Sequence, residues 1–448
     1  MEQILQPDWL LTPEGWKQGW HVVVRQGTIA SLGPAQGSGQ RLSGQALLPG
    51  LVNAHSHAFQ RLIRGRTEFR DPQRPEDDFW SWRELMYQSA LGPSPDQLER
   101  VARLLYLEMV ESGITTVGEF HYQHHQPDGR SYAEPDAMAW ALVRAARWAG
   151  IQLVLLRCAY HRSGFALPPN PRQVRFLDAD WEAAVAAADR LQAAGVAVGL
   201  APHSVRAVPP SWLRPLAEVA RLRGWPLHMH VSEQPAEIEQ CRAECGLSPV
   251  QLLEQEGVLG SNFTAVHAIH LEPQDFRLLS GAHICSCPTT ERNLGDGVVA
   301  ALELRKAGCR FALGTDSQCQ VDLWEDARQL DYHLRLIQRK RAVLDDPPGQ
   351  LETFLWQAVS LGGASSLGQP CGQIAAGLRA DLLAVDLEHP VLACDDPHWL
   401  LAELIWSMPR QAIAQVWSAG VPRLQDGRHP LRGQAVAEFR KTRTELGG

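Results

Sequence analysis

The sequence predicts an α/β fold: a (β/α)8 barrel of the TIM type, flanked by a small β-sandwich domain that the two chain ends form together. Two observations lead to this prediction. Through the middle of the chain, eight short apolar runs, each suited to a buried strand, alternate with helix-like runs. Segments rich in strand formers and turn signals precede and follow this region. We expect residues 1–46 and 375–448 to form the β-sandwich and residues 47–374 to form the barrel.

The chain ends carry hairpin and strand signals. Residues 20–25 form a valine-rich run, which the turn residues Gln26 and Gly27 separate from a second short run at 28–30. Near the other end, residues 380–386 and 414–420 each resemble a short strand followed by a turn. We therefore expect the two ends to pair into one β-rich unit beside the barrel.

Each βα unit of the barrel can be located in the sequence. The strand-like runs are 48–57, 114–120, 151–157, 196–201, 226–231, 263–267, 282–287 and 310–316. The clearest helix-like runs are 97–112, 180–194, 211–223 and 298–307. Each of these four ends just before a glycine, which is a helix stop signal. Such units close into a barrel whose catalytic groups lie at the carboxyl ends of the strands.

Long connections follow the first three strands, at 58–96, 121–136 and 160–179. We expect them to lie as loops over the mouth of the barrel, where long loops commonly carry function. A doubly wound open sheet is the structural alternative. No glycine-rich phosphate loop follows the first strand, which disfavours it.

Composition narrows the class of protein. The formal net charge of -8, from 42 basic and 50 acidic residues, argues against a nucleic-acid partner but leaves room for a small anionic substrate. The nine cysteines are odd in number and include no Cys-x-x-Cys pair, so no disulfide framework is indicated. The amino terminus lacks signal-peptide features and no window is apolar enough to span a membrane. We expect a cytoplasmic protein with no membrane partner.

Polar residues at the expected strand ends predict a metal site. His55 and His57 end the first strand, and side chains two apart on a strand share a face. His230 ends the fifth strand, His267 the sixth and Asp316 the eighth, so all five can converge. Three histidines and a carboxylate satisfy a zinc ion and leave room for water, although iron or manganese could use the same ligands. Glu233 follows His230 by three residues, within reach of that water.

Four motifs in this order resemble the amidohydrolase superfamily, in its deaminase branch: residues 49–57, 228–233, 266–268 and 314–317. Subgroup motifs at 57–61, 80–84, 118–122 and 289–297 resemble the formimidoylglutamate deiminases of histidine degradation. The resemblance implies metal ligands at His55, His57, His230 and Asp316. It also implies a homodimer and hydrolysis of N-formimino-L-glutamate to N-formyl-L-glutamate and ammonia. No lysine lies between His57 and His230, which supports one metal ion, because common dinuclear members bridge two ions with a modified lysine on the fourth strand.

The expected roles follow from this chemistry. A zinc ion lowers the pKa of its bound water from 15.7 to about 7. We expect Asp316 to accept a proton from that water, Glu233 to pass it to the departing nitrogen, and His267 to polarise the water. A substrate with two carboxylates needs cationic partners, for which Arg83 and Arg206 are the candidates.

Gln60, Tyr122 and His203 match positions that contact substrate in the resembled family. His121, His124 and His125 are a second histidine cluster, which we expect in a surface loop without metal. Two rival functions stay open. A deaminase of a heterocycle, such as guanine or a related purine or pyrimidine, would use the same metal set, and a non-catalytic scaffold would be expected to have lost some ligands.

Overall fold

The computed structural model describes residues 2–35, 37–69, 79–168, 170–394, 396–425 and 427–447. Within them, eight parallel strands form the predicted barrel sheet, in sequential order from β6 to β13. The strands are β6 (Leu51–Ser56), β7 (Ile114–His121), β8 (Gln152–Ala159), β9 (Ala197–Pro202), β10 (Leu227–Val231), β11 (Phe263–His267), β12 (His283–Ser286) and β13 (Arg310–Leu313). All eight predicted strands are confirmed.

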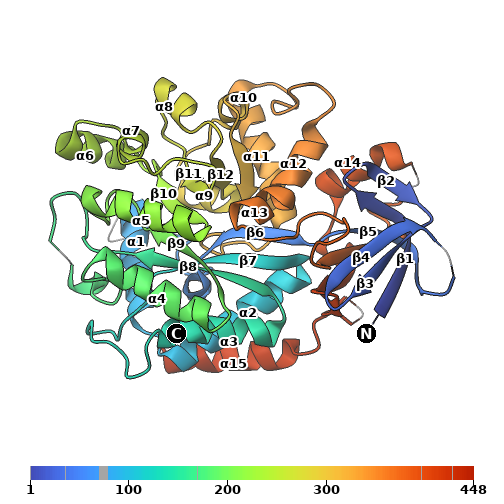
Figure 1. Cartoon of the computed structure of the whole chain (residues 1–448), viewed down its shortest axis with the longest axis horizontal. Coiled ribbons are helices and arrows are strands. Elements are labelled where there is room, and N and C mark those ends of the chain that lie inside the picture. The colour runs from blue at the N-terminus through green and yellow to red at the C-terminus, as the bar shows by residue number, and fades with distance from the viewer. Residues whose placement is uncertain are drawn as a thin grey trace.

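Helices follow the strands, and most of them cover the outside of the barrel (Figure 1). They are α2 (Pro95–Glu111), α3 (Ala137–Ala149), α4 (Trp181–Ala193), α5 (Pro210–Arg223), α6 (Pro235–Cys245), α7 (Pro249–Gln255), α8 (Pro273–Leu278), α9 (Pro288–Leu294), α10 (Ala301–Lys306), α11 (Leu323–Gln338), α12 (Leu351–Val359) and α13 (Leu361–Ser366). Among the helices of the described segments, none combines the length and apolarity needed to cross a lipid bilayer.

The run predicted as one strand at 48–57 is split between two sheets. β5 (Gln40–Pro49) belongs to a second sheet, which lies beside the barrel, and the barrel strand β6 begins after Gly50. A Cβ atom at Gly50 would lie 2.4 Å from the side chain of Thr115, so only glycine fits where the chain crosses from one sheet to the other.

Both chain ends contribute to the second sheet, as predicted. Its eight strands are β1 (Glu2–Thr12), β2 (Gly15–Gln18), β3 (Trp20–Arg25), β4 (Thr28–Pro34), β5, β14 (Leu382–Asp386), β15 (Ile413–Ser418) and β16 (Val421–Pro422). The backbone N–H of Ile29 donates to Leu378 O at 2.8 Å, so the sheet curls until β4 meets the segment before β14. A small core that includes Leu5, Val22 and Trp417 fills the space inside.

Helices near the carboxyl terminus return to the barrel. The last, α15 (Arg432–Glu445), packs along α2, and α14 (Pro397–Ser407) packs against α11 and α12 (Figure 1). Phe439 of α15 is buried with Leu104 and Leu107 of α2 in a separate apolar cluster. This part of 375–448 therefore braces the outside of the barrel, whereas β14 to β16 complete the second sheet.

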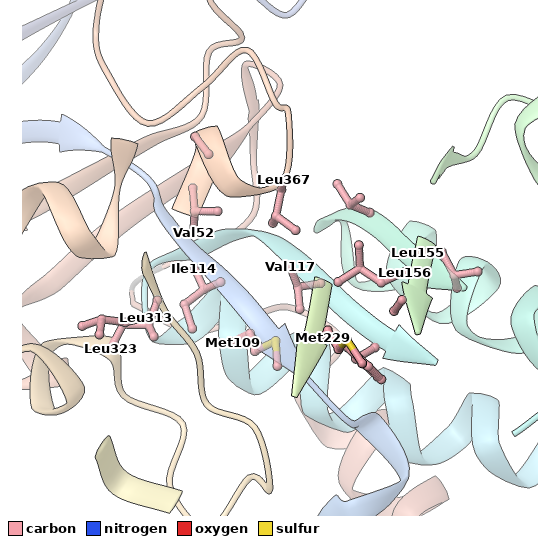
Figure 2. Close-up of a cluster of buried hydrophobic side chains, with 14 of the residues drawn as sticks. Val52, Met109, Ile114, Val117, Leu155, Leu156, Met229, Leu313, Leu323 and Leu367 are labelled. Atoms are coloured by element: carbon pink, nitrogen blue, oxygen red, sulfur yellow. The ribbon is translucent and has the colours of Figure 1, made fainter. Parts of the chain in front are cut away.

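The amino end of the barrel is closed by α13. His228 Nε2 donates to Ser366 O at 2.8 Å, and His283 Nε2 lies 2.8 Å from the Oγ of Ser365. Leu367, just after α13, packs on Gly118 of β7, where a Cβ atom would come within 2.5 Å of its Cδ2. Figure 2 shows Leu367 beside Val117 and Val52 in the main apolar core. A site inside the barrel must therefore open at the carboxyl ends of the strands.

The first long connection differs from the predicted loop. It contains the short 3-10 helix η1 (Ala58–Leu62) and α1 (Phe79–Leu91). The apolar residues of α1 are not confined to one face, since Leu85 is 40% exposed whereas Met86 and Tyr87 are buried. The amphipathic pattern that identifies surface helices is therefore weak here. This helix places Arg83 at the barrel mouth.

Candidate metal centre and substrate cavity

The seam that closes the barrel brings three predicted ligands together. β13 does not pair with β6 along its length. Instead, the N–H of His57 donates to Asp316 O at 3.1 Å, and the N–H of Asp316 donates to His55 O at 3.0 Å. Asp316 has a positive φ of 45°, which is unusual for a residue other than glycine and is typical of functional sites. The chain turns there so that its carboxylate meets the two histidines.

The four predicted ligands converge on one point. His55 Nε2 lies 3.1 Å from His57 Nε2 and 3.2 Å from His230 Nε2. The Oδ1 atom of Asp316 lies 3.4 Å from His55 Nε2 and 3.3 Å from His57 Nε2. In a tetrahedral zinc site, bonds of about 2.0–2.1 Å place neighbouring ligand atoms about 3.4 Å apart. The spacing of these four buried groups fits one divalent metal ion.

The tautomers of two histidines also fit a metal. His57 Nδ1 lies 2.9 Å from Phe120 O, and His230 Nδ1 lies 3.0 Å from His203 O. A carbonyl oxygen only accepts, so each Nδ1 carries the proton and each Nε2 presents a lone pair. Burial lowers the pKa of His55 to about 3 and also lowers those of His57 and His230, which keeps all three neutral. Lone pairs facing one another at about 3 Å repel unless a cation lies between them.

Two further side chains flank the ligands at the predicted strand ends. His267 Nε2 lies 3.6 Å from the Oε1 atom of Glu233 and 3.8 Å from the Oδ2 atom of Asp316. Its Nδ1 lies 3.3 Å from the Oε1 atom of Glu291. Burial alone would lower the pKa of His267, but the carboxylates of Glu233, Glu291 and Asp316 outweigh burial and raise it to about 10. A cation at the ligands would oppose this rise.

A buried carboxyl group supports the segment between His55 and His57. Glu119 Oε2 accepts a hydrogen bond from the Ser56 hydroxyl at 2.8 Å, and its Oε1 accepts from the N–H of Ala58 at 2.6 Å. Although these bonds favour the charged form, burial raises the pKa of Glu119 to about 7. The sequence placed Glu119 in a subgroup motif without a role, and only the structure shows that it holds both sides of His57.

The cavity above the ligands opens to solvent, and the space not filled by atoms, open solvent included, is about 550 Å³. All five predicted substrate-binding residues line it, together with His57, His230, Glu233 and Asp316. Those five are Gln60, Arg83, Tyr122, His203 and Arg206. Gln60 Nε2 donates to the Tyr122 hydroxyl at 3.2 Å, and the guanidinium of Arg83 lies 5.5 Å from the ring of Tyr87. The structure therefore brings three of the four predicted metal ligands and all five predicted substrate residues into one cavity.

Arg206 is more enclosed than the sequence suggests. Its side chain is 7% exposed, and its Nη2 donates to the Oε2 atom of Glu233 at 2.9 Å. Its Nε lies 3.4 Å from the Oε2 atom of Glu237. Burial opposes the charge, but the carboxylates of Glu237 and Glu233 raise the pKa of Arg206. No sequence signal pointed to Glu237, which comes from α6, or to the cavity residues Tyr87 and Tyr160.

The expectation that His121, His124 and His125 lie in a surface loop is wrong for His121, whereas His124 and His125 do lie in the connection that follows β7. His121 is the buried last residue of β7, and His124 and His125 are partly buried. Nε2 of His124 lies 3.0 Å from Cys158 O, and Nε2 of His125 lies 2.9 Å from Leu177 O. The third long connection, residues 160–179, folds over these histidines. It is held there by the ion pair between Asp178 and Arg157 of β8, whose Oδ1 and Nη2 atoms lie 2.5 Å apart. Among the described residues, none of these three histidines belongs to a group able to hold a metal.

Comparison with known proteins agrees with this geometry. Residues 46–423 match the model of the amidohydrolase family. This chain belongs to the amidohydrolase family. A curated formimidoylglutamate deiminase of Pseudomonas aeruginosa is 38% identical over 447 residues, covering 97% of this chain and 98% of that protein. An 8-oxoguanine deaminase of the same organism is 29% identical, covering 86% of each chain.

A solved structure also resembles the whole molecule. The crystal structure of an amidohydrolase from Brucella melitensis matches with a TM-score of 0.92 and 36% identity, and the match covers 100% of both chains. An adenosine deaminase structure from Xanthomonas campestris matches with a TM-score of 0.82 at 22% identity, covering 99% of this chain and 98% of that one. The second likeness shows the shared fold alone.

Proposed function

We propose that this amidohydrolase is a metal-dependent deiminase that converts N-formimino-L-glutamate and water to N-formyl-L-glutamate and ammonia. The observation that carries the proposal is the joint presence of the ligand cluster and two arginines in one cavity. The 38% identity to a formimidoylglutamate deiminase along nearly the full length supports the same substrate. A neutral heterocycle would not require Arg83 and Arg206 together.

Zinc is the ion we propose, because three imidazoles and one carboxylate with room for water are typical of catalytic zinc sites. When bound, it would lower the pKa of a water molecule in the cavity to about 7. The described strand β9 ends in Leu200, Ala201 and Pro202 and carries no lysine to bridge a second ion. One ion therefore suits the site.

The protein groups around that water have distinct tasks. The Oδ2 atom of Asp316 faces His267 and can accept a proton from the attacking water. The carboxylate of Glu233, between His267 and Arg206, can carry that proton to the nitrogen that leaves as ammonia. His267, oriented by Glu291, can hydrogen-bond the oxygen that develops negative charge.

The cavity walls fit the rest of the substrate. Arg83 on α1 and Arg206 after β9 can each bind a carboxylate through two N–H groups. Gln60 and Tyr122, which bond to each other, lie beside His57 and can orient the formimino end. His203 is held between its neighbours by a contact to Ser204 Oγ at 3.1 Å and by ring packing on Tyr160.

A substrate panel tests this proposal. We expect the zinc-loaded protein to have a kcat/KM for N-formimino-L-glutamate at least a hundredfold above those for guanine and 8-oxoguanine. We expect Arg206→Ala to raise KM strongly for the dicarboxylate. A preference for either purine would instead favour the heterocycle deaminase. Absence of turnover on every imine and amine, with zinc bound, would favour a scaffold that has lost its chemistry.

A further inference from the structure

Arg206 lies between two carboxylates that differ in their surroundings. Glu233 lines the cavity and contacts Nη2 of Arg206 at 2.9 Å. Glu237 is fully buried on α6, behind the cavity wall, and contacts the Nε side of the same guanidinium at 3.4 Å. Arg206 therefore has a fixed anionic partner, Glu237, at its Nε atom, which we call the stem. It has a second anionic partner, Glu233, at its Nη2 atom, which we call the tip.

The stem side of Arg206 is held firmly. The Oε1 atom of Glu237 accepts the backbone N–H of Ser232 at 3.0 Å, which fixes that carboxylate. The backbone of Arg206 is fixed as well, because Arg162 Nε donates to Arg206 O at 3.2 Å and Arg162 Nη2 donates to Val205 O at 2.9 Å. Any exchange of partners must therefore happen at the tip, where Glu233 and the cavity meet.

We propose that the substrate carboxylate takes the tip of Arg206 from Glu233, so that Glu233 is released toward the reacting nitrogen only when a carboxylate is bound. This inference rests on the proposed function, since it assumes a dicarboxylate substrate. Glu233 is a hydrogen-bond partner of Arg206, and a carboxylate held by Arg206 at hydrogen-bond distance must compete with it. Glu237 does not compete, and acts as the positioning residue that keeps the guanidinium aimed at the cavity.

The proposal makes opposite predictions for the two carboxylates around one guanidinium. Replacing Glu233 by glutamine removes the competitor, so a dicarboxylate should bind more tightly. Replacing Glu237 by glutamine removes an equal charge at a similar distance from Arg206. This variant, however, removes the carboxylate that positions the guanidinium and leaves the competitor Glu233 in place. A simple gain of positive potential would make both variants bind more tightly, whereas competition at the tip favours only Glu233→Gln.

The test is calorimetric titration of the zinc-loaded protein with glutarate, which has the two carboxylates of the substrate and nothing to hydrolyse. We expect Glu233→Gln to lower the Kd at least tenfold, because a charge-assisted contact no longer has to be broken. Glu237→Gln should leave the Kd unchanged or raise it, and Arg206→Met should abolish binding. Thermal melting confirms that each variant is folded.

Three outcomes would overturn the inference: an unchanged Kd in Glu233→Gln, equal tightening in both glutamine variants, or no glutarate binding by the unmodified enzyme. None of these depends on turnover. Release of ammonia from N-formimino-L-glutamate together with an unchanged Kd in Glu233→Gln would leave the proposed function intact and remove only the coupling.

Substrate analogues give a second test that needs no variant. We compare N-formimino-L-glutamate with 4-(formimidoylamino)butyrate and N-formimino-L-2-aminobutyrate, which lack one or the other carboxylate. One analogue lacks the carboxylate that binds Arg206, and with it both kcat and affinity should fall at least tenfold. The reason is that Glu233 then stays bound to Arg206 and is not released toward the reacting nitrogen. If both analogues keep the full kcat and only KM rises, Arg206 contributes binding alone and the inference is wrong.

Discussion

Removing the Glu119 carboxylate should weaken metal binding even though Glu119 is not a ligand. Its two oxygens accept hydrogen bonds from the Ser56 hydroxyl and the Ala58 N–H, on either side of His57. Ser56 Oγ in turn accepts from Gln318 Nε2 at 3.0 Å, and the same nitrogen lies 2.7 Å from Asp316 O. Glu119 therefore connects His55 of β6 and His57, which directly follows β6, to the ligand that follows β13.

The expected magnitude follows from these contacts. Glu119→Ala leaves two buried donors without an acceptor, and each such group costs about 1–3 kcal/mol. We expect the free energy of unfolding of the metal-free protein to fall by about 2–6 kcal/mol. Changing a group that orients metal ligands typically lowers metal affinity about 10–100-fold. Glu119→Gln keeps an acceptor for the Ala58 N–H, so its loss of zinc affinity should be smaller.

Zinc affinity is measured by competition with a chromophoric chelator, and stability by urea unfolding of the metal-free protein. Glu111→Ala is the matched control, because Glu111 is also buried and accepts from His429 N–H and Arg410 Nη2, each at 2.9 Å. It should lose stability and keep zinc affinity. The reasoning is refuted if Glu119→Ala binds zinc within twofold of the unmodified protein, or if Glu111→Ala loses as much affinity.

Three further predictions concern catalysis, pH and packing. Glu233→Gln should lower kcat by about 10²–10⁴-fold with zinc content unchanged, as measured by ammonia release and metal analysis. Burial lowers the pKa of His283 to about 3, so below pH 6.5 the unfolded chain binds a proton that the native state does not bind. The free energy of unfolding should therefore fall by about 2–3 kcal/mol by pH 4.5. His283→Gln should remove this part of the acid sensitivity, as measured by urea unfolding at pH 6.5 and pH 4.5. Gly362→Ala should destabilise the fold by about 3 kcal/mol or more in thermal melts, because its Cβ would overlap the carbonyl oxygen of Phe311.

Each of these predictions can be contradicted. Near-normal kcat in Glu233→Gln would move proton transfer to another group. An equal loss of stability between pH 6.5 and 4.5 with and without His283 would mean that this histidine is not the acid-sensitive group. An unchanged melting temperature in Gly362→Ala would mean that α13 can move away from β13.

The sequence predicted the barrel and the place of the metal site because both depend on local patterns, whereas the choice of four ligands among the five converging groups came from the resemblance to the amidohydrolase superfamily. Each barrel strand is a short apolar run near a turn or helix stop signal, and the ligands sit where those runs end. Helix α1 was missed because Leu85 is exposed and Arg83 faces the cavity, which blurs the pattern of an amphipathic helix.

Contacts between distant segments could not be predicted. The pairing of Arg206 with Glu237 and the hydrogen bond from the Ala58 N–H to Glu119 join elements far apart in sequence. The burial of His121 depends on the connection that carries Asp178 folding back over β7 and β8. Each is settled by tertiary packing, which residue spacing does not encode.

The central claim is that one metal site and one dicarboxylate cavity act together on a carbon–nitrogen double bond. The most direct test is to measure ammonia and N-formyl-L-glutamate formed from N-formimino-L-glutamate by the zinc-loaded protein, beside Asp316→Asn. We predict one ammonia for each N-formyl-L-glutamate, with both products lost in the variant together with tight zinc binding. Zinc bound to the unmodified protein without release of either product, or full activity in Asp316→Asn, would contradict the account.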